Sequence, residues 1–212
     1  MAIQHYTKNT NFEGLVWNIS ESPEFFMEQL QLSTTQCTNI QEKYKHPTAL
    51  KQWLASRHSL QLLFQTSFAN FHKNTHGKLE LADSQQQLSI SHSDDYIAVV
   101  KASAAIGVDI QTFNPKLSRI ASKFIAKELL SQLQKSSLYQ DYLHVYWGIK
   151  EALFKAYGLG QVNFINHLHI HPFEIAQSGT TTAQISKPNF KATYHVFYEK
   201  TEDYYLCVVT KQ

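Results

Sequence analysis

A long helix is predicted by the stretch LYQDYLHVYWGIKEALFKAY, residues 138–157. Within it, Glu151 and Lys155 are one turn apart and lie on the same face. On a helix surface such a pair adds only a few tenths of a kcal/mol, and the spacing alone favours this plain structural interpretation. Its neighbours, among them Trp147 and Leu153, are mostly apolar. Charges in such surroundings need a partner or a chemical task.

A short buried strand with one carboxylate is predicted upstream, by IGVDIQ at residues 106–111. Because side chains alternate along a strand, Asp109 and Gln111 point the same way. With Glu151 from the helix, their oxygens are hard donors of the kind that Mg²⁺ takes together with waters and substrate phosphates. A satisfied polar group is the commoner explanation for an Asp at a strand end, so the residues alone leave both interpretations open.

A third polar cluster ends an earlier strand, in SISHSDD at residues 89–95. The hydroxyls of Ser91 and Ser93 and the ring of His92 could surround a phosphate. Asp94 and Asp95 are typical turn residues. Serine-rich turns are common, so this cluster is a weak signal by itself.

Helix and strand patterns occur in both halves of the chain, which predicts an α/β (α+β) fold. A boundary near residues 103–106 would give an N-terminal half, 1–104, and a C-terminal half, 105–212, packed together. Further helices are predicted at residues 48–64, 117–124 and 126–133, and strands at 12–19, 79–81, 88–91, 96–100, 106–110, 167–171, 192–198 and 204–209.

The composition excludes several classes of protein. The chain has 212 residues, 43% of them hydrophobic, and a net charge of +2, which excludes a disordered chain. Only Arg57 and Arg119 are arginines, which argues against a nucleic-acid reader. Neither a membrane span nor a secretory signal is visible, and two cysteines are too few for a disulfide framework. We therefore expect a cytoplasmic protein that binds neither nucleic acid nor membrane.

Three imidazoles, His167, His169 and His171, could suggest a zinc site. Neighbours on one strand rarely converge on a single tetrahedral ion without a residue from elsewhere. The solvated face of a strand is the favoured interpretation.

Taken together and in this order, the three polar segments resemble the 4'-phosphopantetheinyl transferase superfamily, in its longer, two-halved Sfp-type branch. The family pattern is a Ser-His-Ser turn, a Gly-(Val/Ile)-Asp-Ile-Glu strand and a Trp-x-x-Lys-Glu-Ala-x-x-Lys helix; here it occupies residues 91–93, 107–111 and 147–155. Upstream, WLASR at 53–57 is similar to the arginine-bearing helix of the family, and Gly77-Lys78 to its Gly-Lys-Pro turn. Two positions depart from the pattern: Gln111 stands where many members have Glu, and Leu79 replaces proline.

The resemblance implies two similar halves with pseudo-twofold symmetry, and a transferase that acts as a monomer. The implied reaction moves the 4'-phosphopantetheine of coenzyme A onto a serine of an apo acyl or peptidyl carrier protein. Adenosine 3',5'-bisphosphate is released, and Mg²⁺ is the cofactor. The family also uses the helix after the metal strand in carrier docking, which makes Lys116, Arg119, Lys123 and Phe124 candidates. A solvated basic helix face is an equally good interpretation of those four residues.

The resemblance also implies roles for individual residues. Asp109 and Glu151, assisted by Gln111, would hold Mg²⁺. Glu151, or a water that it or the metal polarises, would take the proton of the serine. Lys155 would contact the departing phosphate. Binding of coenzyme A would fall to Arg57, Lys78, Ser91, His92, Lys150 and Lys155.

Two other functions stay open at this point. The first is a non-catalytic binding module for coenzyme A or a carrier protein, in which Gln111 marks a decayed metal site. The second is a metal-dependent hydrolase of coenzyme A, which would need no acceptor.

Overall fold

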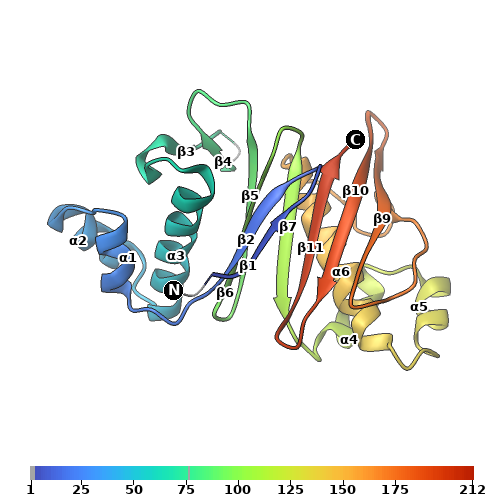
Figure 1. Ribbon diagram of the computed structural model, residues 1–212. Coiled ribbons are helices and arrows are strands. Elements are labelled where there is room, and N and C mark those ends of the chain that lie inside the picture. Colours follow the sequence, from blue (N-terminus) through green and yellow to red (C-terminus); the bar gives the residue numbers. More distant parts are fainter. Residues whose placement is uncertain (1–2, 76) are drawn as a thin grey trace.

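Two antiparallel sheets lie side by side with helices at either end of the molecule (Figure 1). The computed structural model describes residues 3–75 and 77–212. The strand order is β1-β2-β6-β5 in the first sheet and β7-β11-β10-β9-β8 in the second, and β3 and β4 form a separate pair. The helices are α1 (Pro23–Gln29), α2 (Thr34–Lys43), α3 (Pro47–Phe64), α4 (Leu117–Ile120), α5 (Lys127–Leu133) and α6 (Tyr139–Tyr157), with short 3₁₀ turns η1 (Phe68–Asn70) and η2 (Ala121–Lys123). The strands are β1 (Ile3–Lys8), β2 (Glu13–Asn18), β3 (Phe71–Lys73), β4 (Leu79–Leu81), β5 (Gln87–Ser93), β6 (Tyr96–Ala102), β7 (Ile106–Thr112), β8 (Leu168–Ile170), β9 (Ser178–Lys187), β10 (Phe190–Lys200) and β11 (Tyr204–Lys211).

The predicted α/β class is confirmed, because each sheet is covered by one long helix. All strands of the first sheet precede those of the second in the chain. The division into halves at residues 104 and 105, which lie in the connection between β6 and β7, remains our proposal. The pseudo-twofold relation between the halves stays a prediction.

The long helix α3 covers the first sheet. Its buried face includes Leu54 and Leu60, which pack with Leu15 and Trp17 of β2. The helix predicted over residues 48–64 is confirmed.

The second long helix, α6, covers the second sheet and ends in a left-handed cap at Gly158. Helix and sheet touch most closely at Gly107 of β7, where an added Cβ would stand 1.9 Å from the carbonyl oxygen of Ala152. Only glycine allows this approach, so the Gly-Val-Asp sequence sets how near β7 lies to the helix.

The two sheets pack on each other through an apolar layer that includes Val16, Val100, Val108 and Leu206. Because Val108 faces this layer, the neighbouring side chain of Asp109 faces α6 instead. β7 therefore presents one apolar face to the first sheet and one polar face to the helix.

The predicted helix over residues 117–124 is wrong in part: it divides into the short α4 and the 3₁₀ turn η2. Phe124 is fully buried, which contradicts its choice as a docking residue. In the described part of the chain, no helix is long and apolar enough to cross a bilayer.

Candidate active site

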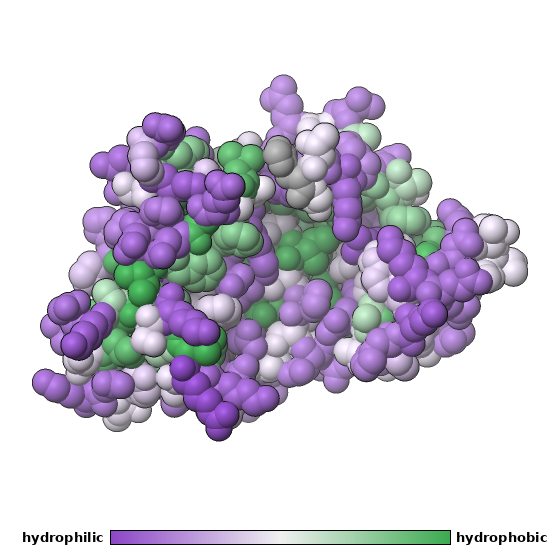
Figure 2. All heavy atoms as spheres, turned by 180° about the vertical axis from the view of Figure 1, so that it is seen from behind, coloured by the Kyte–Doolittle hydropathy of each residue, from purple (hydrophilic) through white to green (hydrophobic). Residues whose placement is uncertain are grey.

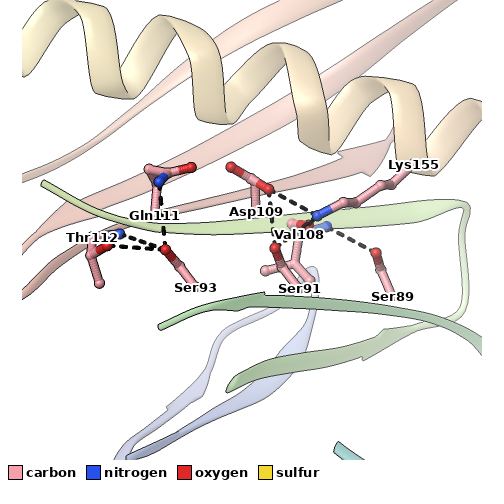
Figure 3. Close-up of polar contacts among 8 residues, drawn as sticks. All are labelled: Ser89, Ser91, Ser93, Val108, Asp109, Gln111, Thr112 and Lys155. Atoms are coloured by element: carbon pink, nitrogen blue, oxygen red, sulfur yellow. Dashed lines mark hydrogen bonds and ion pairs between the residues drawn. The ribbon is translucent and has the colours of Figure 1, made fainter. Parts of the chain in front are cut away.

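Three alternate serines of β5 face β7 and connect the two sheets (Figure 3). Ser89 Oγ accepts the backbone N–H of Val108 at 3.1 Å, and Ser91 Oγ donates to Asp109 Oδ1 at 3.0 Å. At the end of the two strands, Ser93 Oγ accepts the backbone N–H of Thr112 at 3.1 Å. Side-chain hydroxyls thus bridge β5 and β7, where a sheet would use backbone hydrogen bonds.

Lys155 ties α6 to this junction. Its Nζ donates to Ser91 Oγ at 2.8 Å, to the carbonyl oxygen of Val108 at 2.9 Å and to Asp109 Oδ1 at 2.8 Å. An ammonium has three protons, so each of them has an acceptor. The Glu151 to Lys155 surface pair that helical spacing favours is therefore not what Lys155 forms, because its ion pair is with Asp109.

The second oxygen of Asp109 is free, in contrast. Asp109 is only 7% exposed, and its Oδ2 is buried without a hydrogen-bond partner among the described residues. Figure 3 shows Asp109 and Gln111 on the same side of β7, with the amide oxygen of Gln111 directed toward this carboxylate. Two acceptors face each other with no donor between them, an arrangement that a cation would stabilise.

A second carboxylate lies within electrostatic reach. Burial and then the Asp109 carboxylate raise the pKa of Glu151, while Lys155 lowers it. Burial also raises the pKa of Asp109, although Lys155, Ser91 and His92 act in the opposite direction. Both shifts mean that negative charge is costly here, because one ammonium faces two carboxylates.

These residues fit a Mg²⁺ ion. The unpartnered Asp109 Oδ2, the Gln111 amide oxygen and the Glu151 carboxylate are hard oxygen donors, to which water and substrate phosphates can be added. Within residues 3–75 and 77–212, no three or more His, Cys, Asp or Glu side chains form a metal-binding group. The imidazoles of His167, His169 and His171 accordingly do not converge on a zinc ion.

A cleft of about 570 Å³ opens beside this group, between the Gly77-Lys78 turn and the end of α6. Lys78 and Lys155 supply positive charge, and the remaining wall is largely apolar, including Leu88, Phe154 and Leu159. Figure 2 shows a hollow near the middle of this face, with hydrophobic residues inside and hydrophilic residues around it. The volume is within the usual range for a site that binds a small molecule.

The side chain of Lys78 lies against the C-terminal end of α6, where its Cδ would be 3.7 Å from a Cβ on Gly158. Burial lowers the pKa of Lys78, and Glu80 raises it. His92 is exposed, near Asp109 and Lys155: partial burial and then Lys155 lower its pKa, and Asp109 raises it. Ser91, His92, Lys78 and Lys155 are thus near the cleft or the carboxylates.

Arg57 and Lys150 are placed elsewhere, contrary to our expectation. The Arg57 guanidinium packs 4.7 Å from the ring centre of Trp53 and donates to Ser56 Oγ. Lys150 is 5% exposed, and its Nζ donates to the carbonyl oxygen of Phe164. Position 150 is 100° around the helix from position 151, so the side chain of Lys150 turns away from the face that carries Glu151. Neither residue lines the cleft in this structure.

The burial of Lys150 predicts a pH-dependent stability. Burial lowers the pKa of Lys150 from 10.5 to about 8, so between these values the unfolded chain binds a proton that the folded chain lacks. The free energy of unfolding should therefore rise with pH across this window. Lys150→Met has no group that titrates at this position, so we expect its stability to lose that rise. The difference in melting temperature between parent and variant, measured from pH 8 upward, should therefore shrink as the pH increases. The exposed control Lys191→Met should follow the parent; parallel curves for Lys150→Met and the parent would contradict the prediction.

Ser93 was expected to lie near a phosphate, and its hydroxyl instead contacts Gln111 and Thr112. Ser89 and Thr112 also belong to the junction but were not singled out in the sequence. The signal that could have found them is the alternation of serines in SISHS, because alternate positions of a strand share one face. The alternation does not predict that these serines contact β7, because that depends on how the two sheets pack against each other.

Two comparisons with known proteins show what this chain is similar to. The sequence profile of the 4'-phosphopantetheinyl transferase superfamily matches residues 105–209, the region that supplies Asp109, Gln111, Glu151 and Lys155. The chain is also similar to the 4'-phosphopantetheinyl transferase gsp of Aneurinibacillus migulanus. The two are 25% identical over 185 residues, which cover 85% of this chain and 73% of the relative. The chain therefore belongs to the 4'-phosphopantetheinyl transferase superfamily and is an enzyme of the transferase class.

Proposed function

We propose that this protein transfers the 4'-phosphopantetheine moiety of coenzyme A to a serine of an acyl or peptidyl carrier protein, with release of adenosine 3',5'-bisphosphate. One observation carries the proposal: Lys155 pairs with Asp109 beside a cleft that suits an anionic ligand, and one Asp109 oxygen has no partner among the described residues. Glu151 lies within electrostatic reach of both groups. Phosphoryl transfer needs such a set of positioned charges.

Coenzyme A suits the cleft in size and charge. An adenine ring could pack on apolar side chains such as Phe154 and Leu159, and phosphates could reach Lys78 and Lys155. His92 is near enough to the same charges to assist. A role for Arg57 or Lys150 in this binding remains a sequence-based prediction, because their side chains have other partners.

Glu151 is the proposed base. It lies near Asp109, and no hydrogen bond or ion pair occupies its carboxylate among the described residues. A raised pKa makes a carboxylate better suited to accept the proton of a serine hydroxyl. The attacking oxygen then becomes more nucleophilic without free hydroxide.

Lys155 is proposed to stabilise the leaving phosphate. All its protons have acceptors, so a phosphate oxygen would have to replace one of them, and Asp109 Oδ1 is the one with a negative charge. Mg²⁺ bound by Asp109, Glu151 and Gln111 would supply neutralisation of the pyrophosphate charge.

The mass of a carrier protein tests the proposal. The protein would be incubated with coenzyme A, Mg²⁺ and an apo carrier, and the carrier should gain the mass of one phosphopantetheine. A range of carriers left unmodified would favour the non-catalytic binding module instead. Adenosine bisphosphate released without any acceptor would indicate the hydrolase.

The carrier is proposed to dock beside β7, on the exposed basic side chains Lys116, Arg119 and Lys123. The family resemblance implies a carrier that is acidic around its modified serine, so charge reversal should weaken the encounter. We expect Arg119→Glu to raise KM for the carrier about tenfold with kcat nearly unchanged. The exposed control Lys191→Glu makes the same charge change on β10. An unchanged KM for Arg119→Glu would exclude this surface.

A further inference from the structure

We infer that Asp94 is a positioning residue: through Thr112 and Ser93 it fixes which end of the Gln111 amide faces Asp109. The inference rests on the proposed function, because it concerns the oxygen set proposed for Mg²⁺. It is carried by the order of the hydrogen bonds between the β5–β6 turn and β7.

The turn that holds Asp94 is itself fixed. Asp94 and Asp95 form a two-residue turn between β5 and β6, and Asp94 has a φ of 46°. The carbonyl oxygen of Asp94 accepts from Gln52 Nε2 at 2.9 Å, and that of Asp95 accepts from the N–H of Ile19 at 2.7 Å. Contacts from α3 and from the residue after β2 therefore hold the backbone of this turn in place, and the Asp94 carboxylate is positioned by its contact with Thr112.

The direction of each hydrogen bond follows from the chemistry of Asp94. A carboxylate only accepts, so the Thr112 hydroxyl donates its one proton to Asp94 Oδ2, 2.5 Å away. In the 3.1 Å contact between Thr112 Oγ1 and Ser93 Oγ, Ser93 must then be the donor. The Ser93 hydroxyl has thereby used its proton and can only accept from other groups. It accepts from the Thr112 N–H at 3.1 Å and from Gln111 Nε2 at 3.5 Å.

Residue 111 must consequently offer Ser93 a donor. The amide of Gln111 does so with its NH₂ group, which leaves its oxygen directed toward the unpartnered Asp109 Oδ2, as Figure 3 shows. A carboxylate at position 111 would instead meet a lone pair of the Ser93 oxygen. Asp94 thus favours an amide over a carboxylate at position 111. It acts through the hydroxyl groups of Thr112 and Ser93, which lie between the two residues.

Asp94→Asn provides the test, because an amide can donate as well as accept. It permits the reverse order, in which the new amide donates to Thr112, Thr112 to Ser93, and Ser93 to residue 111. Gln111→Glu should then be tolerated better when combined with Asp94→Asn than when made alone. The experiment is a double-mutant cycle of these two changes, followed by thermal unfolding in chelator and by calorimetric titration with Mg²⁺.

In chelator, Gln111→Glu should lower the melting temperature, because it adds a third carboxylate beside Asp109 and Glu151. The fall should be clearly smaller in the Asp94→Asn background. Gln111→Glu should tighten the binding of Mg²⁺. The factor by which the dissociation constant falls should be at least about three times as large in the Asp94→Asn background. Equal losses in chelator for both backgrounds would overturn the inference.

Removal of a charge alone could mimic this rescue, so Asp95→Asn is the matched control. It removes the same charge from the neighbouring exposed position, while the bond to Thr112 comes from Asp94. Rescue by Asp95→Asn as large as that by Asp94→Asn would overturn the inference. Ser93→Ala should abolish the coupling between positions 94 and 111, and coupling that persists would also overturn it.

The two proposals can fail separately. If no variant binds Mg²⁺ but the coupling appears in chelator, the positioning by Asp94 holds and the metal site of the proposed function fails. If Mg²⁺ binds and the effects are additive in both media, the metal site holds and the positioning fails.

Discussion

Glu151→Gln should lower the rate of phosphopantetheine transfer by at least about 10²-fold, the lower limit for the loss of a positioned general base. The substitution keeps the shape of the side chain and removes the charge that would accept the serine proton. It also removes one carboxylate from a place where burial and Asp109 already raise the pKa of Glu151. The melting temperature in chelator should therefore stay level or rise, while transfer is lost. Single-turnover assays of carrier modification, read by mass, measure the effect.

The exposed acid Glu128 on α5 offers the matched control. Glu128→Gln makes the same chemical change away from β7 and should leave transfer unchanged. Nearly normal turnover by Glu151→Gln would contradict the role of Glu151 as base. A variant that loses activity only because it unfolds would show a lower melting temperature, which separates the two causes.

The sequence predicted the chemical groups of this site better than their partners. The IGVDIQ strand and the 138–157 helix were both predicted, and so was the shared face of Asp109 and Gln111. These features follow from the periods of strand and helix, which are local. The ion pair of Lys155 with Asp109 is not local, because it depends on how near β7 lies to α6.

The same distinction explains why the surroundings of Lys150 were not predicted. Next to Glu151 in sequence, it was expected to reach the coenzyme, but neighbouring helical positions point in different directions, and its ammonium meets the Phe164 carbonyl instead. The strand β9 was not predicted because its SGTTT beginning is polar, without the alternation that identifies a half-buried strand. The segment is a strand because it pairs with β10 along its whole length, a contact that its own sequence pattern does not predict.

Gly107→Ala should cause the largest loss of stability among these variants. An added Cβ would stand 1.9 Å from the carbonyl oxygen of Ala152, and a backbone atom in the middle of a helix cannot move aside as a side-chain end can. Overpacking of this kind costs about 3 kcal/mol or more. For a chain of this size, that predicts a fall in melting temperature of roughly 6–12 °C.

Gly148→Ala is the informative comparison, because it changes another close contact between α6 and the same sheet, this time with β11. Its added Cβ would stand 2.8 Å from Cys207 Sγ, a side-chain atom, and alanine favours the helix by about 1 kcal/mol over glycine. Its melting temperature should therefore fall less than that of Gly107→Ala. If instead Gly107→Ala melts with the parent, β7 does not lie against α6 at the distance described. The contacts of Lys155 with Asp109 and Val108 would then lose their structural basis, because that close approach is what brings the ammonium within reach of the strand.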